Sequence, residues 1–272
     1  MIPSQRITTK GVIELFEAGA GAPVVLVHAS GMGAKRWNRV FATWRDKFRL
    51  LAPNLLGYGA SGPFDEATWT VEDEVALIGE MLDMAAQPVH LVGHSFGGGC
   101  ALRAALRWPE KVATLSLYEP TVFSLVRARG DRPARAELRR FDHSDYLDPK
   151  RAGEDEWLAT FVDYWSQAAF WDVMLPVQRD ALRAVGRKVF AEVRSLLTEP
   201  EEMIAQFAAV DRPTLVLHGD RTTAAGRCMS RQLAELLPDV ELVMIERAGH
   251  LAPLVRVAPV CAAIEAFIKR RG

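Results

Sequence analysis

The sequence contains few cysteines. Only three occur in 272 residues, and none of them belongs to a CxxC pattern. Cys100, Cys228 and Cys261 lie in apolar, helix-like stretches without metal-ligand spacing to a histidine, which argues against a disulfide framework and a zinc site. Free thiols fit the reducing cytosol best. We therefore expect a cytoplasmic protein that uses no metal and no cofactor.

Long apolar runs are also absent. The amino-terminal stretch MIPSQRITTK has no apolar core of the kind that a signal peptide needs, and runs such as Val24 to Val27 are far too short to span a bilayer. The sequence predicts neither export nor a membrane anchor.

Neither sign of charge is in excess. Lys and Arg number 33 and Asp and Glu number 34, for a formal net charge of -1. A protein that binds nucleic acid through its phosphates normally carries a clear basic excess. We expect a small-molecule ligand, with no nucleic-acid and no membrane partner, and leave homodimer formation open.

Buried strands and amphipathic helices alternate along most of the chain. This rhythm is typical of an α/β protein with a mostly parallel central sheet and helices on both faces. A hairpin is expected to open the chain around the Lys10-Gly11 turn. The main predicted strands are 23–29, 49–54, 89–94, 112–118, 213–220 and 241–246. Helical spacing covers residues 37–48, and further helices are predicted at 71–84, from residue 95 onward, at 224–237 and at 254–269.

The alternation of predicted strands and helices stops in the middle of the chain. Between residues 121 and 210 helical patterns replace strands, and aromatic side chains gather in WLATFVDYWSQAAFW. The strands on either side must join one sheet, so the insertion interrupts a domain. We predict a core formed by residues 1–120 and 211–272, with residues 121–210 as a helical cap.

One serine lies between two glycines directly after a predicted strand. In GHSFG, Gly93, Ser95 and Gly97 form the GxSxG pattern at a strand-to-helix junction, the setting of a nucleophile elbow. A helix-capping serine is the alternative. A serine hydroxyl is a poor nucleophile until a base removes its proton. His250, in ERAGHLAP just after the last strand, is the candidate base.

These motifs and their order resemble the α/β-hydrolase fold with a helical cap. The resemblance covers essentially the whole chain: HASG follows the third strand, NLLGYGASG the fourth, GHSFG the fifth, LHGD the seventh and GH the eighth. It implies a serine hydrolase with a Ser-His-acid triad, and it is much less specific for the reaction.

The triad acid departs from the usual pattern of this family. Its common position after the seventh strand holds Thr222, and Asp220 comes only one residue after Gly219. Some members carry the acid at the end of the sixth strand, where this chain has Glu119 in LSLYEP. We favour Glu119 as the acid and keep Asp220 as the alternative.

The oxyanion hole should consist of two backbone N–H groups. Phe96 follows the nucleophile at a helix start, where N–H groups lack intrahelical partners. The resemblance points to Ser30 in HASG for the second donor, with Ala29 as the alternative.

The cap supplies the candidate pocket. Trp157, Trp165 and Trp171 are expected to roof an apolar substrate site, although such a stripe also suits helix packing. We predict a serine esterase that cleaves a small, neutral or apolar ester, thioester or lactone through an acyl-enzyme. The alternatives are a carbon-carbon bond hydrolase, a hydroxynitrile-lyase-like enzyme and a non-catalytic small-ligand-binding protein.

Overall fold

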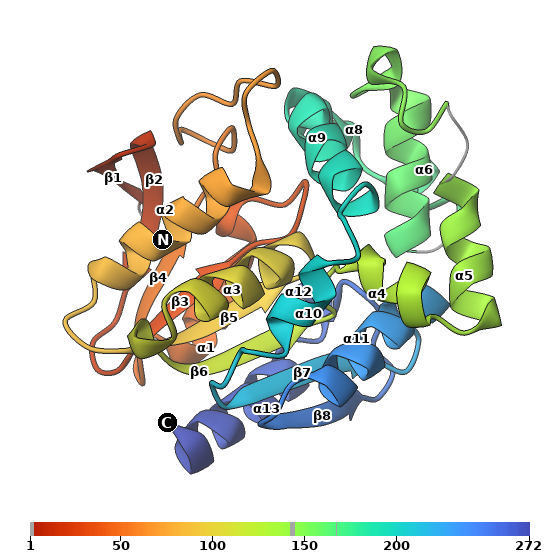
Figure 1. The fold of residues 1–272 in the computed structure, drawn as a ribbon. Helices are drawn as coiled ribbons and strands as arrows, with labels where there is room; N and C mark the ends of the chain where they lie inside the picture. The colour runs from red at the N-terminus through yellow and green to blue at the C-terminus, as the bar shows by residue number, and fades with distance from the viewer. Residues whose placement is uncertain (1–2, 142–144, 167) are drawn as a thin grey trace.

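The computed structural model describes residues 3–141, 145–166 and 168–272. An eight-stranded sheet in the order β1-β2-β4-β3-β5-β6-β7-β8 runs through the centre of the molecule (Figure 1). Strands β3 to β8 are parallel to one another, whereas β1 and β2 form an antiparallel hairpin, and β2 pairs antiparallel with β4. The strands are β1 (Pro3–Thr8), β2 (Gly11–Ala18), β3 (Pro23–Val27), β4 (Arg49–Pro53), β5 (Val89–His94), β6 (Val112–Tyr118), β7 (Thr214–Gly219) and β8 (Val240–Ile245).

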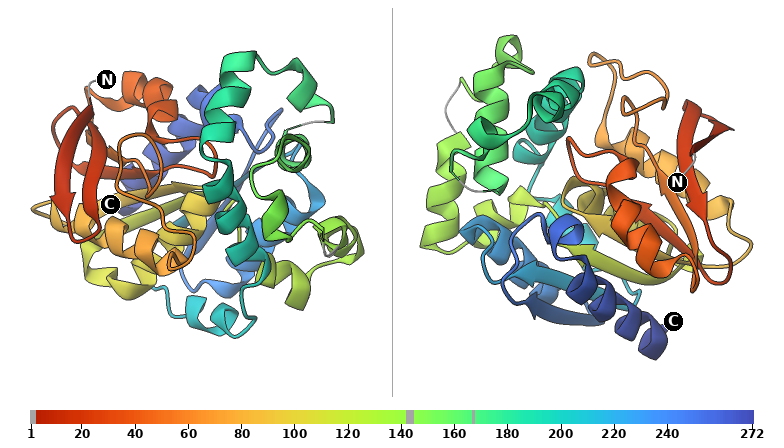
Figure 2. Two further views of the ribbon diagram at one scale, coloured as in Figure 1. Left: turned by 90° about the horizontal axis from the view of Figure 1, so that it is seen from above. Right: turned by 180° about the vertical axis from the view of Figure 1, so that it is seen from behind.

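Helices cover both faces of the sheet (Figures 1 and 2). On one face α1, α12 and α13 bury their apolar sides, and on the other face α2, α3 and α11 do so. The predicted α/β architecture with a mostly parallel sheet is therefore confirmed. These helices are α1 (Asn38–Trp44), α2 (Val71–Asp83), α3 (Phe96–Arg107), α11 (Ala224–Leu236), α12 (Ala252–Val255) and α13 (Val257–Arg271).

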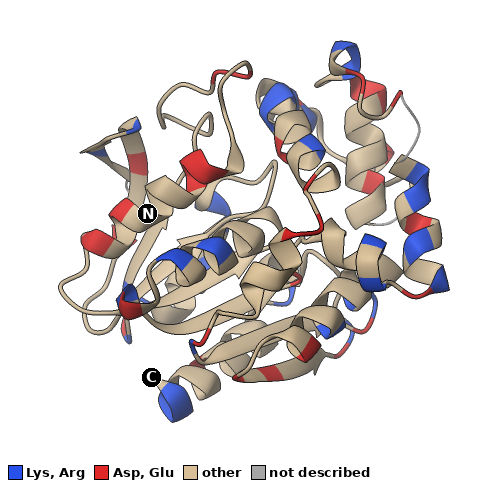
Figure 3. Ribbon diagram, viewed as in Figure 1, with Lys and Arg blue, Asp and Glu red and all other residues tan. Residues whose placement is uncertain are grey.

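The parallel strands owe their position to their composition. Every residue of β3, β5 and β7 is buried, and Figure 3 shows the charged residues mainly on the outer helices and loops. Strands buried on both faces need nearly continuous apolar runs, which is what the sequence supplies. The carboxyl ends of these strands consequently meet at one buried edge, where the candidate site residues lie.

The last predicted helix is divided in two. The sequence predicts one helix from Leu254 to Lys269, but α12 ends at Val255 and α13 begins at Val257. Pro259 explains the break, because its ring nitrogen has no hydrogen to donate to the carbonyl of Val255. In the first turn of α13 the same proline needs no such bond.

The segment between β6 and β7 is helical. Helix α4 packs on α11 and α10 packs on α3, whereas α6, α8 and α9 stand over the carboxyl edge of the sheet (Figure 1). The division into a core and a 121–210 cap stays a prediction. The elements are α4 (Phe123–Arg129), α5 (Arg132–Leu138), α6 (Asp155–Trp165), α7 (Phe170–Val173), α8 (Pro176–Ala184), α9 (Gly186–Leu197) and α10 (Met203–Phe207), and short 3-10 turns occur at Ala34–Trp37, Pro109–Lys111, Arg139–Phe141 and Pro149–Arg151.

Within the described ranges, no helix combines the length and the hydropathy needed to cross a bilayer. All three cysteines are buried free thiols.

Candidate active site

Ser95 lies at a strained turn between β5 and α3. Its backbone has φ 54° and ψ -120°, a region that residues other than glycine rarely adopt. Two neighbours hold this conformation: the Ser95 N–H donates to the carbonyl of Tyr118 at 3.0 Å, and the Thr121 N–H donates to the carbonyl of Ser95 at 3.1 Å. The turn raises the side chain at the edge of the sheet, as a nucleophile elbow does.

The two glycines of GxSxG are needed for close packing at this turn. A Cβ atom on Gly97 would lie 2.4 Å from the carbonyl oxygen of His28, and one on Gly93 would lie 2.6 Å from that of Gly97. Both distances are too short for real contacts. The elbow therefore requires glycine on both sides of the serine for steric reasons.

Glu119 and His250 form a buried hydrogen-bonded pair. The Nδ1 atom of His250 lies 2.7 Å from Oε2 of Glu119, and the two side chains are 4% and 0% exposed. The N–H of Gly219 donates to Oε1 at 2.9 Å, and the hydroxyl of Thr222 donates to Oε2 at 2.7 Å. Because the carboxylate is surrounded by donors, Nδ1 carries the hydrogen and Nε2 is left as the basic nitrogen.

Asp220 occupies a different environment. Its Oδ1 atom accepts a hydrogen bond from the N–H of Ala248 at 3.0 Å, and backbone N–H donors around it lower its pKa. Among the described residues it makes no hydrogen bond with His250. It behaves as a turn-stabilising carboxylate, whereas the hydroxyl of Thr222 donates to Glu119.

The hydroxyl of Ser95 has a partner that the sequence did not reveal. Its Oγ atom lies 3.1 Å from Oγ1 of Thr121, and no hydrogen bond joins Ser95 to the His250 ring in the described part of the chain. The two residues are nevertheless neighbours in the fold, because His94 Nε2 donates to the backbone carbonyl of His250 at 2.8 Å. Catalytic hydrogen bonds are often loose without substrate and tighten in the complex.

Trp165 covers the histidine. The indole ring of Trp165 stacks on the imidazole of His250 with ring centroids 4.0 Å apart and an interplanar angle of 26°. Since Trp165 ends α6, a residue of the inserted segment contacts the candidate base directly. An aromatic face also attracts a protonated imidazole, as it attracts other cations.

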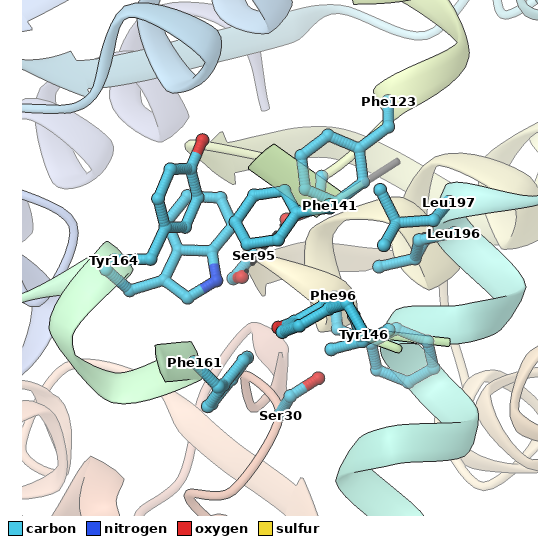
Figure 4. A pocket seen from close by; sticks show the side chains of 13 residues that line it. Ser30, Ser95, Phe96, Phe123, Phe141, Tyr146, Phe161, Tyr164, Leu196 and Leu197 are labelled. Carbon is cyan, nitrogen blue, oxygen red and sulfur yellow. Dashed lines mark hydrogen bonds between the residues drawn. The ribbon is translucent and has the colours of Figure 1, made fainter. Parts of the chain in front are cut away.

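The candidate oxyanion donors lie at the same cavity as Ser95. Ser30 and Phe96 line this cavity together with Ser95 (Figure 4). No hydrogen bond from the N–H of either residue to another described residue is present, so both are free to bind a ligand oxygen. Ala29 does not line the cavity, and its carbonyl accepts from the N–H of Met32 at 3.2 Å.

The cavity is mainly aromatic. Only one of the three tryptophans expected there, Trp165, lies on its wall. Trp157 instead packs inside the helical segment, where its indole N–H donates to the carbonyl of Tyr146 at 2.9 Å, and Trp171 packs beneath Arg179 and Arg183. The lining residues are Ser30, Ser95, Phe96, Thr121, Phe123, Phe141, Tyr146, Phe161, Tyr164, Trp165, Val193, Leu196 and Leu197 (Figure 4).

The position of each tryptophan follows from helical spacing. Phe161 and Trp165 are one turn apart on α6 and both reach the cavity, but Trp157 lies one turn farther back and stacks on Phe161 instead, with ring centroids 5.9 Å apart. Wall residues such as Phe141 and Leu196 carry no motif, so the sequence offers no signal for them.

His28 supports the loop that contains Ser30. Its Nε2 atom accepts a hydrogen bond from the N–H of Leu55 at 3.0 Å, and burial lowers the pKa of His28 from 6.5 to about 4. In the unfolded chain the imidazole of His28 gains a proton near pH 6.5, but in the folded chain it does so only near pH 4. The contribution of neutral His28 to the free energy of unfolding is therefore complete above pH 6.5 and is lost as the pH falls toward 4.

We expect replacement of His28 by Gln to reduce the amount by which the free energy of unfolding falls between pH 7 and pH 4.5. The amide oxygen can still accept from the N–H of Leu55, but the group no longer titrates, so roughly 2 kcal/mol of the loss should disappear. Urea unfolding of both proteins at pH 7 and pH 4.5 measures the difference. Burial also lowers the pKa of His94, so part of the pH dependence of stability should remain in the variant. Equal losses in the two proteins would show that His28 is not involved.

A serine on a strand-to-helix elbow lies at the edge of a parallel sheet, where a histidine and a carboxylate form a pair. This combination of fold and site is typical of α/β-hydrolases. The comparisons with known proteins agree. Residues 24–263 match the Alpha/beta hydrolase family, and the chain belongs to this family.

Two curated proteins and one solved structure illustrate the similarity. A 2-hydroxymuconate semialdehyde hydrolase of Pseudomonas sp. (strain CF600) is 28% identical over 272 residues, with 93% of this chain and 89% of the relative covered. Lipase LipV of Mycobacterium tuberculosis is 31% identical over 152 residues, 56% of each chain. The crystal structure of the enol-lactonase from Burkholderia xenovorans LB400 superimposes with a TM-score of 0.75, covering 98% of this chain and 100% of the other, but at 16% identity it shows the fold alone.

Proposed function

We propose that this protein is a serine hydrolase whose triad is Ser95, His250 and Glu119, and that it cleaves small esters, thioesters or lactones with an apolar acyl group. The observation that carries the proposal is the 2.7 Å contact between His250 Nδ1 and Glu119 beside the elbow of Ser95. In this contact Nδ1 is the nitrogen that faces the carboxylate, so Nε2 is the nitrogen available to accept the proton of Ser95.

The reaction proceeds in two halves. The Ser95 hydroxyl turns from Thr121 toward His250, gives its proton to Nε2 and attacks the acyl carbon. The charge that develops on the carbonyl oxygen is stabilised by the N–H groups of Phe96 and Ser30. His250 then protonates the leaving alcohol or thiol. In the second half, water loses a proton to His250 and attacks the acyl-enzyme, and His250 then returns that proton to the Ser95 oxygen as the acid is released.

The cavity wall favours a neutral, flat acyl group. None of the described residues on this wall is Lys, Arg, Asp or Glu. Seven of them are Phe, Tyr or Trp. Aromatic walls bind apolar and planar groups well. A carboxylate in the same place would lose its hydration without gaining a cationic partner.

Carbon-carbon bond hydrolysis is the second candidate. Its support is the similarity over nearly the whole chain to the 2-hydroxymuconate semialdehyde hydrolase and the partial match, 38% identity over 122 residues, to a 2-hydroxy-6-oxo-2,4-heptadienoate hydrolase of Pseudomonas putida. A dienoate is an anion, and the absence of a cation on the described wall counts against it.

A comparison of substrates tests the proposal. We expect p-nitrophenyl butyrate and p-nitrophenyl benzoate to be cleaved with a kcat/KM roughly 100-fold above that for 2-hydroxy-6-oxo-2,4-heptadienoate, because the anion loses several kcal/mol on entering an uncharged cavity. The reverse order would establish the carbon-carbon hydrolase. Release of cyanide from mandelonitrile without ester cleavage would establish the lyase, and thermal stabilisation by these compounds without turnover would establish a binding protein.

A further inference from the structure

Three charged side chains are buried together between α9 and α2. Lys188 and Glu192 of α9 are 2% and 0% exposed, and Glu74 of α2 is 0% exposed. The ammonium group of Lys188 lies 2.6 Å from Glu74 Oε1 and 3.5 Å from Glu192 Oε1. It also lies 3.5 Å from the ring centroid of Trp69.

Glu74 is tied to the core by two further donors. The indole N–H of Trp69 donates to Oε1 at 2.9 Å, and the N–H of Leu56 donates to Oε2 at 3.1 Å. Burying three charges is costly and contributes little net stability even when they are paired. Such a cluster is better explained by the geometry that it imposes, which here is one position of α9 against the core.

Tyr58 connects this cluster to the loop after β3. Its hydroxyl donates to Glu192 Oε2 at 2.8 Å and accepts from the N–H of Gly31 at 2.9 Å. Burial and the nearby Glu192 raise the pKa of Tyr58, so the hydroxyl keeps its hydrogen for this bond. The ring also packs edge-on against His28, with centroids 4.7 Å apart.

Gly31 directly follows Ser30 and has φ +73°. Its N–H belongs to the peptide plane that contains the carbonyl of Ser30, so the hydroxyl of Tyr58 fixes the orientation of this plane. Without that bond the flexible glycine could rotate the plane and move Ser30.

We propose that Tyr58 and Glu192 are positioning residues for the oxyanion hole: through Gly31 they hold the Ser30 N–H toward the substrate, and they do so only while α9 is docked on the core. This inference rests on the proposed function, because it assumes that Ser30 binds the oxyanion. Neither side chain lines the cavity. Tyr58 acts through Gly31, and Glu192 acts through Tyr58 and through its own hydrogen bond with the Ser30 side chain.

Replacing Tyr58 by Phe tests this role by removing one oxygen atom. We expect kcat for p-nitrophenyl butyrate to fall roughly 10- to 100-fold with little change in KM, because a displaced donor weakens binding of the transition state and leaves the apolar contacts with the substrate in place. A general loosening of the cavity would raise KM as well, and that result would overturn the inference.

Ser124 provides a matched control. Its buried hydroxyl donates to Glu199 Oε2 at 3.0 Å, and Glu199 forms a second buried ion pair with Arg103 of α3. This pair also joins the inserted segment to the core, but none of its described contacts reaches the loop after β3. Ser124→Ala should therefore leave kcat almost unchanged, and an equal fall in both variants would mean that any lost hydroxyl near the helical segment has this effect.

Amide hydrogen exchange separates the inference from the proposed function. The N–H of Gly31 should be protected in the wild-type protein and in Ser124→Ala, and it should exchange much faster in Tyr58→Phe. Unchanged protection of Gly31 in Tyr58→Phe would overturn the inference whatever the enzyme does. If Tyr58→Phe keeps full kcat while Ser95→Ala is inactive, the inference fails and the proposed function stands; if Ser95→Ala stays active, the proposed function fails.

Discussion

Replacement of Glu119 by Gln is expected to lower kcat for p-nitrophenyl butyrate by roughly 10³- to 10⁴-fold. The carboxylate accepts the hydrogen of His250 Nδ1 at 2.7 Å, whereas an amide can present its NH₂ group and favour the tautomer with the hydrogen on Nε2. That tautomer cannot accept the proton of Ser95. Initial rates measured with circular dichroism and thermal unfolding of the same samples show whether the loss is chemical.

Asp220→Asn is the matched control for this change. It removes the same charge from the other candidate acid, whose Oδ1 atom accepts from the N–H of Ala248. An amide oxygen can still accept that bond, so kcat should change by no more than a few-fold. A near-normal rate for Glu119→Gln together with a large loss for Asp220→Asn would transfer the role of the acid to Asp220.

Replacement of Ser95 by Ala is expected to lower kcat by about 10⁶-fold, the size of effect seen when a triad nucleophile is removed. The hydroxyl bonds only to Thr121 in the described part of the chain, and alanine inherits the same backbone strain, so the free energy of unfolding should change by less than about 1 kcal/mol. Urea unfolding checks the stability and ester turnover checks the rate.

Ser116 offers a control for the loss of a buried serine hydroxyl. It lies on β6, and its Oγ atom has no hydrogen-bond partner among the described residues. Removing an unsatisfied hydroxyl costs little, so Ser116→Ala should keep the wild-type rate. Substantial activity in Ser95→Ala would exclude Ser95 as the nucleophile.

The centre of the sheet was predictable because its strands β3, β5 and β7 are short and mostly apolar. Runs such as Val24 to Val27 and Leu215 to Leu217 are typical of strands that a parallel sheet buries on both faces. The carboxyl ends of neighbouring parallel strands meet at one edge, and for this reason Glu119 at the end of β6 could be expected near His250 after β8. The GxSxG pattern placed Ser95 at the same edge.

The cavity wall was predictable only in part. Trp165 was expected there and lines it, but Trp157 and Trp171 do not. A helical stripe shows which side chains share a face, but it does not show whether that face meets the core, another helix or a ligand. That choice depends on how the helices of the inserted segment pack against one another.

Two features of the site were beyond the reach of sequence patterns. Thr121 reaches Ser95 because the chain turns sharply after Glu119, which has φ 43°, and a single threonine carries no signal for such a contact. Lys188, Glu192 and Glu74 are ordinary charged residues in amphipathic helices, where charges usually face water. Their burial depends on the approach of α9 to α2, which no local pattern encodes.

Whether Ser95 attacks the substrate is tested most directly with a fluorophosphonate ester and peptide mapping by mass spectrometry. The wild-type protein should gain a single adduct on Ser95 and lose ester turnover in parallel, Glu119→Gln should react far more slowly, and Ser95→Ala should gain no adduct. Complete loss of turnover with the adduct on another residue, or full turnover with Ser95 modified, would contradict the assignment of Ser95 as the nucleophile.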